Sequence, residues 1–197
     1  MENWFVPVVV LPIKFNPLGK EFDNWLLPRL PIPSPPPPLL LGFVFVSVFT
    51  GGGLNKSVKA FQIGGPLGGV VPTKEIDNLN LDFQEFTAAG FMLGHASVVS
   101  IPSDFNMVDY IHHLFEFTAE ESCGKCFPGR LGSYRGKEMF DQVKNKSAKI
   151  PLKLLNELLI TMKKGCLCAL CGAIPTPIMN ILKYFGHEMK DDMVKEN

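Results

Sequence analysis

The chain has 197 residues, 46% of them hydrophobic, and a mean hydropathy of +0.16, so it can bury a core and is not a disordered chain. Its 19 basic and 19 acidic residues leave no net charge, which gives no electrostatic reason to expect nucleic acid or an anionic membrane as a partner. The most apolar stretch, Leu39–Thr50, falls short of the roughly 20 residues of a membrane helix, and the chain start lacks a basic signal region. We therefore expect a cytoplasmic protein without a membrane span.

All cysteines lie in the C-terminal half of the chain, in two tight groups. They are Cys123, Cys126, Cys166, Cys168 and Cys171. Disulfide frameworks usually spread their cysteines along a chain, whereas grouped cysteines are typical of metal ligation in a reducing compartment. We interpret Cys166 as an ordinary buried thiol.

Residues 1–50 are predicted to be a proline-rich tail or linker, because the run Pro35–Pro38 and the prolines before it interrupt every periodic pattern. After a GGG turn, a small α+β unit is predicted, with strands at Val58–Ile63 and Ala96–Ile101. The first of these strands leads into Gly64–Gly69 (GGPLGG), which predicts a sharply turning loop.

Helices are predicted in the C-terminal half. The first follows Ser103 and Asp104, either of which can cap it, and ends before Cys123. Its apolar positions at helical spacing are Met107, Tyr110, Ile111, Leu114 and Phe115. Pro128 occupies the first turn of the second helix. The predicted buried stripe of that helix includes Leu131, Tyr134, Phe140 and Val143.

The third helix is predicted to begin at Pro151 and to end before Gly165, a residue suited to the position after a helix. Its apolar face consists of Leu152, Leu155, Leu158, Leu159 and Met162. Thr176 and Pro177 are a cap and first-turn pair for a fourth helix that stops near Gly186. This helix carries Ile178, Ile181, Leu182 and Phe185. Four helices with short connections predict a bundle.

The cysteines fall in the connections of this bundle. Cys123 and Cys126 lie between helices one and two, and Cys168 and Cys171 lie between helices three and four. In an up-down bundle these two loops lie at the same end, so we expect them to assemble a soft-metal site. Thiolates bind both zinc and iron–sulfur clusters, and the spacing alone leaves both alternatives open.

The residues around the cysteines are more specific than their spacing. The segments concerned are KAFQIGGPLGG (59–69), LDFQEFTAAG (81–90), LGH (93–95), FEFTAEESCGKC (115–126), GSYRG (132–136) and LCALCGAIPTPIMNILKYF (167–185). Through them, residues 58–189 resemble the C-terminal half of the flavoprotein (51 kDa) family of NADH:quinone oxidoreductase. Within that family the resemblance is to the beta subunit of NAD-dependent, molybdenum-containing formate dehydrogenase.

The resemblance implies a partial ubiquitin-like β-grasp domain, here residues 51–105, followed by a four-helix bundle, here residues 106–197, that carries one [4Fe–4S] cluster. Carried over by position, Cys123 and Cys126 match the first two ligands and Cys168 matches a distant ligand. The third ligand position is Gly129, which has no side chain to donate. Cys171 stands where the family usually has glycine. Three outcomes stay open: an exchangeable ligand on the open iron, substitution by Cys171, or no cluster.

The resemblance also implies a function. We expect an electron-transfer module of a dehydrogenase that is not active alone, because the family's FMN- and NADH-binding domain is not recognisable in this chain. Gly64–Gly69 is not a nucleotide loop, since GGPLGG does not follow the GxGxxG pattern. FMN and NAD would then be supplied by a missing domain. The partners implied are a thioredoxin-like iron–sulfur subunit and a larger dehydrogenase subunit. The alternatives are a structural zinc protein holding zinc through the same four cysteines, and a degenerate fragment without function.

Overall fold

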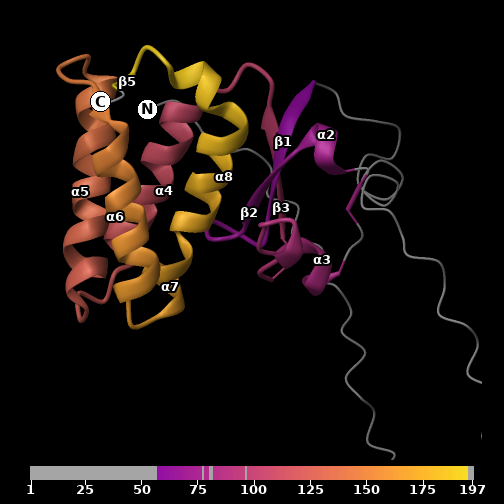
Figure 1. Ribbon diagram of the computed structural model, residues 1–197, viewed down its shortest axis with the longest axis horizontal. Coiled ribbons are helices and arrows are strands. Elements are labelled where there is room, and N and C mark those ends of the chain that lie inside the picture. Colours follow the sequence, from indigo (N-terminus) through magenta and orange to yellow (C-terminus); the bar gives the residue numbers. More distant parts are fainter. Residues whose placement is uncertain (1–56, 77, 80–81, 96, 195–197) are drawn as a thin grey trace, which may run out of the picture.

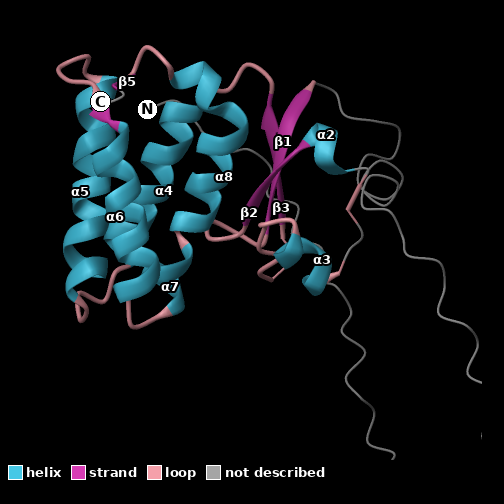
Figure 2. Cartoon of the chain, in the orientation of Figure 1, coloured by secondary structure: helices cyan, strands magenta, loops and turns pink. Residues whose placement is uncertain are grey.

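The computed structural model describes residues 57–76, 78–79, 82–95 and 97–194. It combines a small sheet with a group of longer helices, so the predicted α+β class is confirmed (Figures 1 and 2). The predicted proline-rich tail at residues 1–50 and the GGG turn lie outside the described residues.

The sheet has three antiparallel strands in the order β2-β1-β3. These are β1 (Val58–Ile63), β2 (Gly69–Pro72) and β3 (Val98–Pro102). The strands predicted at 58–63 and 96–101 are thereby confirmed, the second shifted by two residues at its start. The glycine loop turns the chain tightly between β1 and β2, with the Gly68 N–H donating to the Gly65 carbonyl at 2.9 Å. We did not predict β2, whose four residues GVVP are too few to show a pattern.

Two short helices cover the part of the sheet that faces away from the longer helices (Figure 1). They are α2 (Thr73–Ile76) and α3 (Phe83–Ala88). Asp82 caps α3 by accepting hydrogen bonds from the Gln84 and Glu85 N–H groups. Their buried side chains close a separate small core on the sheet, centred on the fully buried Phe86.

The four long helices lie side by side, and α8 lies between the other three and the sheet (Figure 1). They are α4 (Met107–Glu121), α5 (Phe127–Lys144), α6 (Leu152–Gly165) and α8 (Pro175–Phe185). A short helix, α7 (Ala169–Ala173), and a 3-10 turn, η2 (Gly186–Met189), precede and follow α8. All four predicted helices are therefore present, and their buried residues form one continuous core that also contacts β1 and β2.

The ends of three helices differ from prediction. Asn106, not Ser103 or Asp104, caps α4, and its side chain accepts from the Val108 N–H at 2.8 Å. Helix α6 includes Gly165 and is followed by Cys166, and α8 begins at Pro175 rather than after Thr176. Differences of one or two residues at a helix end are ordinary.

The predicted buried stripe of α5 is confirmed in its second half, where Phe140 and Val143 are buried, and is wrong in its first half. Leu131 and Tyr134 are about half exposed, at 48% and 55%. The buried face instead carries small residues near its start, namely Gly129, Gly132, Ser133 and Gly136. Small side chains allow neighbouring helices to approach closely, and a position next to Gly136 is filled by the Phe115 ring of α4. Hydrophobicity therefore predicted the wrong face of this half of the helix.

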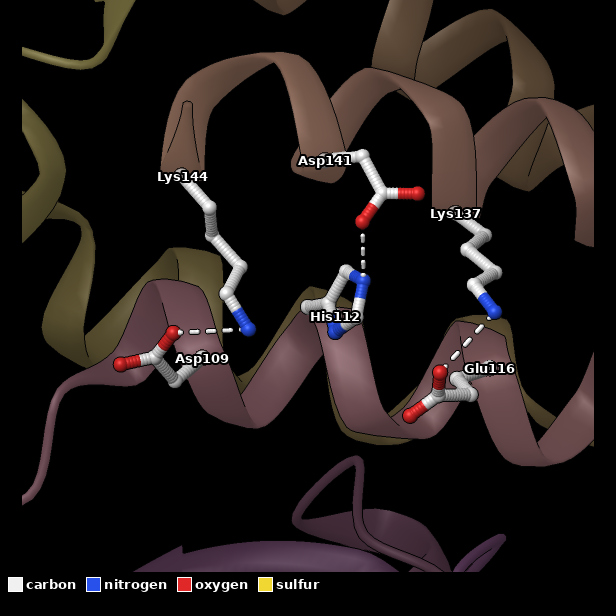
Figure 3. A network of polar contacts seen from close by, with 6 residues as sticks. All are labelled: Asp109, His112, Glu116, Lys137, Asp141 and Lys144. Atoms are coloured by element: carbon white, nitrogen blue, oxygen red, sulfur yellow. Dashed lines mark hydrogen bonds and ion pairs between the residues drawn. The ribbon is translucent and has the colours of Figure 1, made fainter. Parts of the chain in front are cut away.

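A row of polar contacts joins the facing sides of α4 and α5 (Figure 3). Asp109 contacts Lys144 at 3.3 Å, His112 contacts Asp141 at 2.7 Å, and Glu116 contacts Lys137 at 2.9 Å. The residue numbers of the partners rise along α4 as they fall along α5, as expected for antiparallel helices.

Two strands of two residues each, β4 (Ile150–Pro151) and β5 (Met193–Val194), pair in parallel. Strand β4 directly precedes α6, and this pair was not predicted.

Candidate metal centre

The first cysteine pair lies in the loop between α4 and α5. Cys123 is exposed, whereas Cys126 is 8% exposed and is the residue that caps α5. Gly124 between them has a φ of +69°, a conformation that glycine adopts without strain, and this bends the loop back on itself. The bend brings Cys126 to the start of a helix, where backbone N–H groups are unpaired and can stabilise an anion.

The remaining cysteines follow α6 in the loop to α7. Cys166 directly follows α6 and is partly buried, Cys168 is exposed and directly precedes α7, and Cys171 within α7 is 2% exposed. Each pair therefore has an exposed first cysteine and a buried second one.

The two loops meet at the start of α5. A Cβ atom placed on Gly129 would lie 2.8 Å from the Cys126 sulfur and 2.9 Å from the Cys171 sulfur. The predicted meeting of the two loops is therefore observed at these residues. The Cys171 thiol also donates to the Ser122 hydroxyl at 3.8 Å, which ties α7 to the end of α4.

The surroundings of the thiols differ, and so do their pKa values. Backbone N–H groups of Leu167 and Gly129 hydrogen-bond the Cys126 sulfur and lower the pKa of this thiol. Burial, followed by the charge of Cys126, raises the pKa of Cys166 to about 12. Burial also raises the pKa of Cys171, and the Cys168, Cys126 and Cys123 thiolates add to that effect. The thiols of the two loops therefore influence one another's pKa values, with the Cys126 thiolate favoured and the Cys166 and Cys171 thiols held in the neutral form.

The donor set suits a soft metal. All five cysteines are free, and thiolates are the ligands preferred by iron–sulfur clusters and by zinc. Among the described residues, no three His, Cys, Asp or Glu side chains already lie in the arrangement of a single metal ion. The structure thus brings the predicted cysteines Cys123, Cys126, Cys168 and Cys171 to one end of the helices, with Cys166 beside them.

Basic residues lie near this cysteine cluster to different degrees. The Arg130 side chain packs over the bend at Gly124, 3.7 Å from the position of a Cβ there. Arg135 instead pairs with Glu138 at 3.2 Å on the exposed face of α5. The observed contacts therefore make Arg130, and not Arg135, the basic neighbour of the site.

Two groups at the site were not singled out from the sequence. The Leu167 backbone N–H has no sequence signal, because any residue other than proline supplies one. Ser122 directly precedes the first cysteine, and its hydroxyl becomes significant only when α7 is placed against α4.

The described part of the chain contains no helix that is long and apolar enough to cross a membrane.

The sequence that forms this site matches a known protein family. Residues 109–192 match the family described as NADH-ubiquinone oxidoreductase-F iron-sulfur binding region. The chain is 35% identical over 141 residues to "NADP-reducing hydrogenase subunit HndC" of Solidesulfovibrio fructosivorans, which covers 70% of this chain and 29% of that protein. It is 29% identical over 128 residues to "NADH-ubiquinone oxidoreductase 51 kDa subunit, mitochondrial" of Aspergillus niger, covering 64% of this chain and 26% of the relative.

A solved structure has the same fold. The structure described as "Crystal structure of NAD+-reducing [NiFe]-hydrogenase in the H2-reduced state" aligns with a TM-score of 0.67 at 22% identity. The alignment covers 81% of this chain and 27% of the solved chain. This chain therefore spans less than a third of the length of the curated relatives named here. The chain is a homologue of the 51 kDa flavoprotein of NADH-quinone oxidoreductase over about 70% of its length, and its residues 109–192 belong to the NADH-ubiquinone oxidoreductase-F iron-sulfur binding region family.

Proposed function

We propose that this chain is an electron-transfer module that holds a [4Fe–4S] cluster between the α4–α5 loop and the α6–α7 loop. The observation that carries the proposal is the convergence of Cys126 and Cys171, from two separate loops, on the backbone of Gly129. Cys123 and Cys168 are the exposed members of the same two pairs. When bound, such a cluster accepts and passes on single electrons.

The chain's own residues are suited to hold such a group. A thiol must lose its proton to ligate iron, and the hydrogen bonds from Leu167 and Gly129 favour the Cys126 thiolate. N–H donors near ligand sulfurs also raise the potential of a cluster, because they stabilise added negative charge. Arg130 over the Gly124 bend acts in the same direction.

The family relationship supports further proposals about the assembly. We propose that the long helices α4, α5, α6 and α8 are the family's four-helix bundle, over residues 106–197, and that residues 51–105 are its partial β-grasp domain. FMN and NAD would be supplied by a nucleotide-binding domain that is not recognisable in this sequence. The proposed partners are a thioredoxin-like iron–sulfur subunit and a larger dehydrogenase subunit of the kind found in formate dehydrogenases. The proposed location of the complex is the cytoplasm, where thiols stay reduced.

A zinc site is the second candidate, because two C-x-x-C pairs supply the four thiolates that structural zinc takes. Anaerobic purification of the full chain, followed by iron, sulfide and zinc analysis, separates the two. Iron with sulfide and a visible absorption band that dithionite bleaches supports the electron-transfer module. Zinc without sulfide supports the structural site, and a folded chain without any metal contradicts both.

A further inference from the structure

A side chain on Gly129 would occupy the same space as the Cys171 side chain at the candidate metal centre. A Cβ on Gly129 would lie 2.9 Å from the Cys171 sulfur and 3.1 Å from its Cβ, closer than ordinary van der Waals contact. Helix α5 and helix α7 therefore cannot both carry a side chain at this point without moving apart. The Cys171 thiol fits at this point because Gly129 has no side chain.

Cys171 is held in this volume by contacts on several sides. It is buried in the core of the long helices, and its thiol is hydrogen-bonded to Ser122 at the end of α4. Cys171 lies in α7, which directly follows Cys168, and the Gly172 N–H donates a hydrogen bond to the Cys168 carbonyl at 3.2 Å. The Cys171 sulfur therefore has a defined place beside the Cys126 sulfur.

We propose that Cys171 supplies the thiolate ligand that Gly129 cannot supply, so that each loop contributes a C-x-x-C pair to the cluster. This inference rests on the proposed function and specifies its ligand set: Cys123 and Cys126 from one loop, Cys168 and Cys171 from the other. On ligation the Cys171 thiol releases its proton and forms a sulfur–iron bond.

Cys166 is the competing fifth thiol, and its placement is different. The three atoms nearest to a Cβ on Gly129 belong to Cys126 and Cys171, and none belongs to Cys166. The Cβ of Cys166 lies instead 3.7 Å from the position of a Cβ on Gly172. Cys166 therefore lies beside α7 and next to the Cys126 thiol, and Cys166→Ala tests whether this competing thiol is the ligand instead.

The experiment compares the full chain with Cys171→Ala and Cys166→Ala after anaerobic reconstitution with iron and sulfide. We expect the wild type and Cys166→Ala to bind about four irons each, and Cys171→Ala to lose at least about a quarter of the iron. The electron paramagnetic resonance spectrum of the dithionite-reduced protein should change in Cys171→Ala alone. Equal iron and identical spectra in wild type and Cys171→Ala would overturn the inference, as would loss of iron in Cys166→Ala alone.

Two further variants distinguish the loss of a ligand from the loss of the fold. Cys171→Ser keeps the size of the side chain, and an altered spectrum in this variant supports ligation by Cys171, whereas an unchanged spectrum contradicts it. The double variant Gly129→Cys with Cys171→Gly moves the thiol across the shared volume and should restore the iron lost in Cys171→Ala. Failure to restore it in a chain that circular dichroism shows to be folded contradicts the exchange of positions.

The failure of the proposed function has a different signature. A wild-type chain that takes up no iron with sulfide overturns the proposed function together with this inference. A wild-type chain that loads fully beside an equally loaded Cys171→Ala overturns only the assignment of Cys171.

Discussion

Gly136 is the residue at which the contact between α4 and α5 depends most directly on a missing side chain. A Cβ there would collide with the ring of Phe115, which is fully buried and stacks at a tilt on Phe140 with ring centroids 5.9 Å apart. We expect Gly136→Ala to lower the free energy of unfolding by about 1–3 kcal/mol, because a filled core resists added volume. Denaturant unfolding of the full chain followed by circular dichroism measures this.

The control for that prediction is Gly186→Ala at the end of α8. No heavy atom lies within 4 Å of a Cβ at this position, and its φ of −56° suits alanine. The stability of this variant should stay within about 0.5 kcal/mol of wild type. Equal effects of the two substitutions would show that the crowding at Phe115 does not determine stability.

At the scale of elements, the ion pairs between α4 and α5 make stability depend on pH. The hydrogen bond and charge of Lys137 lower the pKa of Glu116 below its usual value. A carboxyl with a depressed pKa contributes stability above its unfolded pKa and loses it as pH falls through its folded pKa. We expect Glu116→Gln to cost up to about 1 kcal/mol at neutral pH, because the pair is partly exposed, and nothing in strong acid.

Urea unfolding at neutral and acid pH, in low and high salt, tests this dependence. High salt should reduce the cost of Glu116→Gln by screening the pair. Glu157→Gln, on an exposed position of α6, is the matched control and should show no such pH dependence. A cost for Glu116→Gln that is equal at both pH values would mean that packing, not charge, determines it.

One buried amide adds hydrogen bonds to the apolar contact between α8 and the neighbouring sheet unit. Asn180 accepts a hydrogen bond from the Val70 N–H at 3.3 Å and donates one to the Gly90 carbonyl at 3.0 Å. Asn180→Ala leaves both backbone groups without this partner, and we expect it to cost about 1–3 kcal/mol. Hydrogen exchange should show faster loss of protection at Val70 of β2.

The exposed Asn156 of α6 is the matched control for that substitution. Asn156→Ala should change neither the unfolding free energy beyond about 0.5 kcal/mol nor the protection of Val70. Unchanged protection in Asn180→Ala would show that apolar packing alone holds α8 against the sheet.

At the scale of the whole molecule, the proposed cluster links the ends of two helix pairs. Because a bound group stabilises only the folded state, the loaded chain should melt above the same chain after iron removal, by about 2–4 °C per kcal/mol of added stability for a chain of this length. Thermal unfolding of the loaded and iron-free forms measures the difference.

The double variant Cys123→Ala with Cys168→Ala provides the control for melting. Both residues are exposed, so their replacement should leave the folded iron-free chain unchanged. Its melting temperature should not respond to iron and sulfide. A wild-type chain that takes up iron without any rise in melting temperature would contradict a site that spans both loops.

The sequence predicted the local structure of the helices well and the face of α5 poorly. Regular apolar spacing marked α4, α6 and α8, since each buries side chains at that spacing. In the first half of α5 the buried positions are glycines and Ser133, which carry no hydrophobic signal. The short strands β2, β4 and β5 escaped prediction because a strand of two to four residues is defined by its partner.

The sequence by itself determined the helices, the two cysteine pairs and the family to which residues 109–192 belong, because these depend on residue type and spacing along the chain. The tertiary structure alone decided that the atoms nearest to a side chain on Gly129 belong to Cys126 and Cys171. That arrangement depends on how closely α5 and α7 approach, and residues 129 and 171 are 42 positions apart in the chain numbering, so no local pattern can encode it. Side-chain packing between the two loops decides which sulfur occupies the volume that Gly129 leaves free.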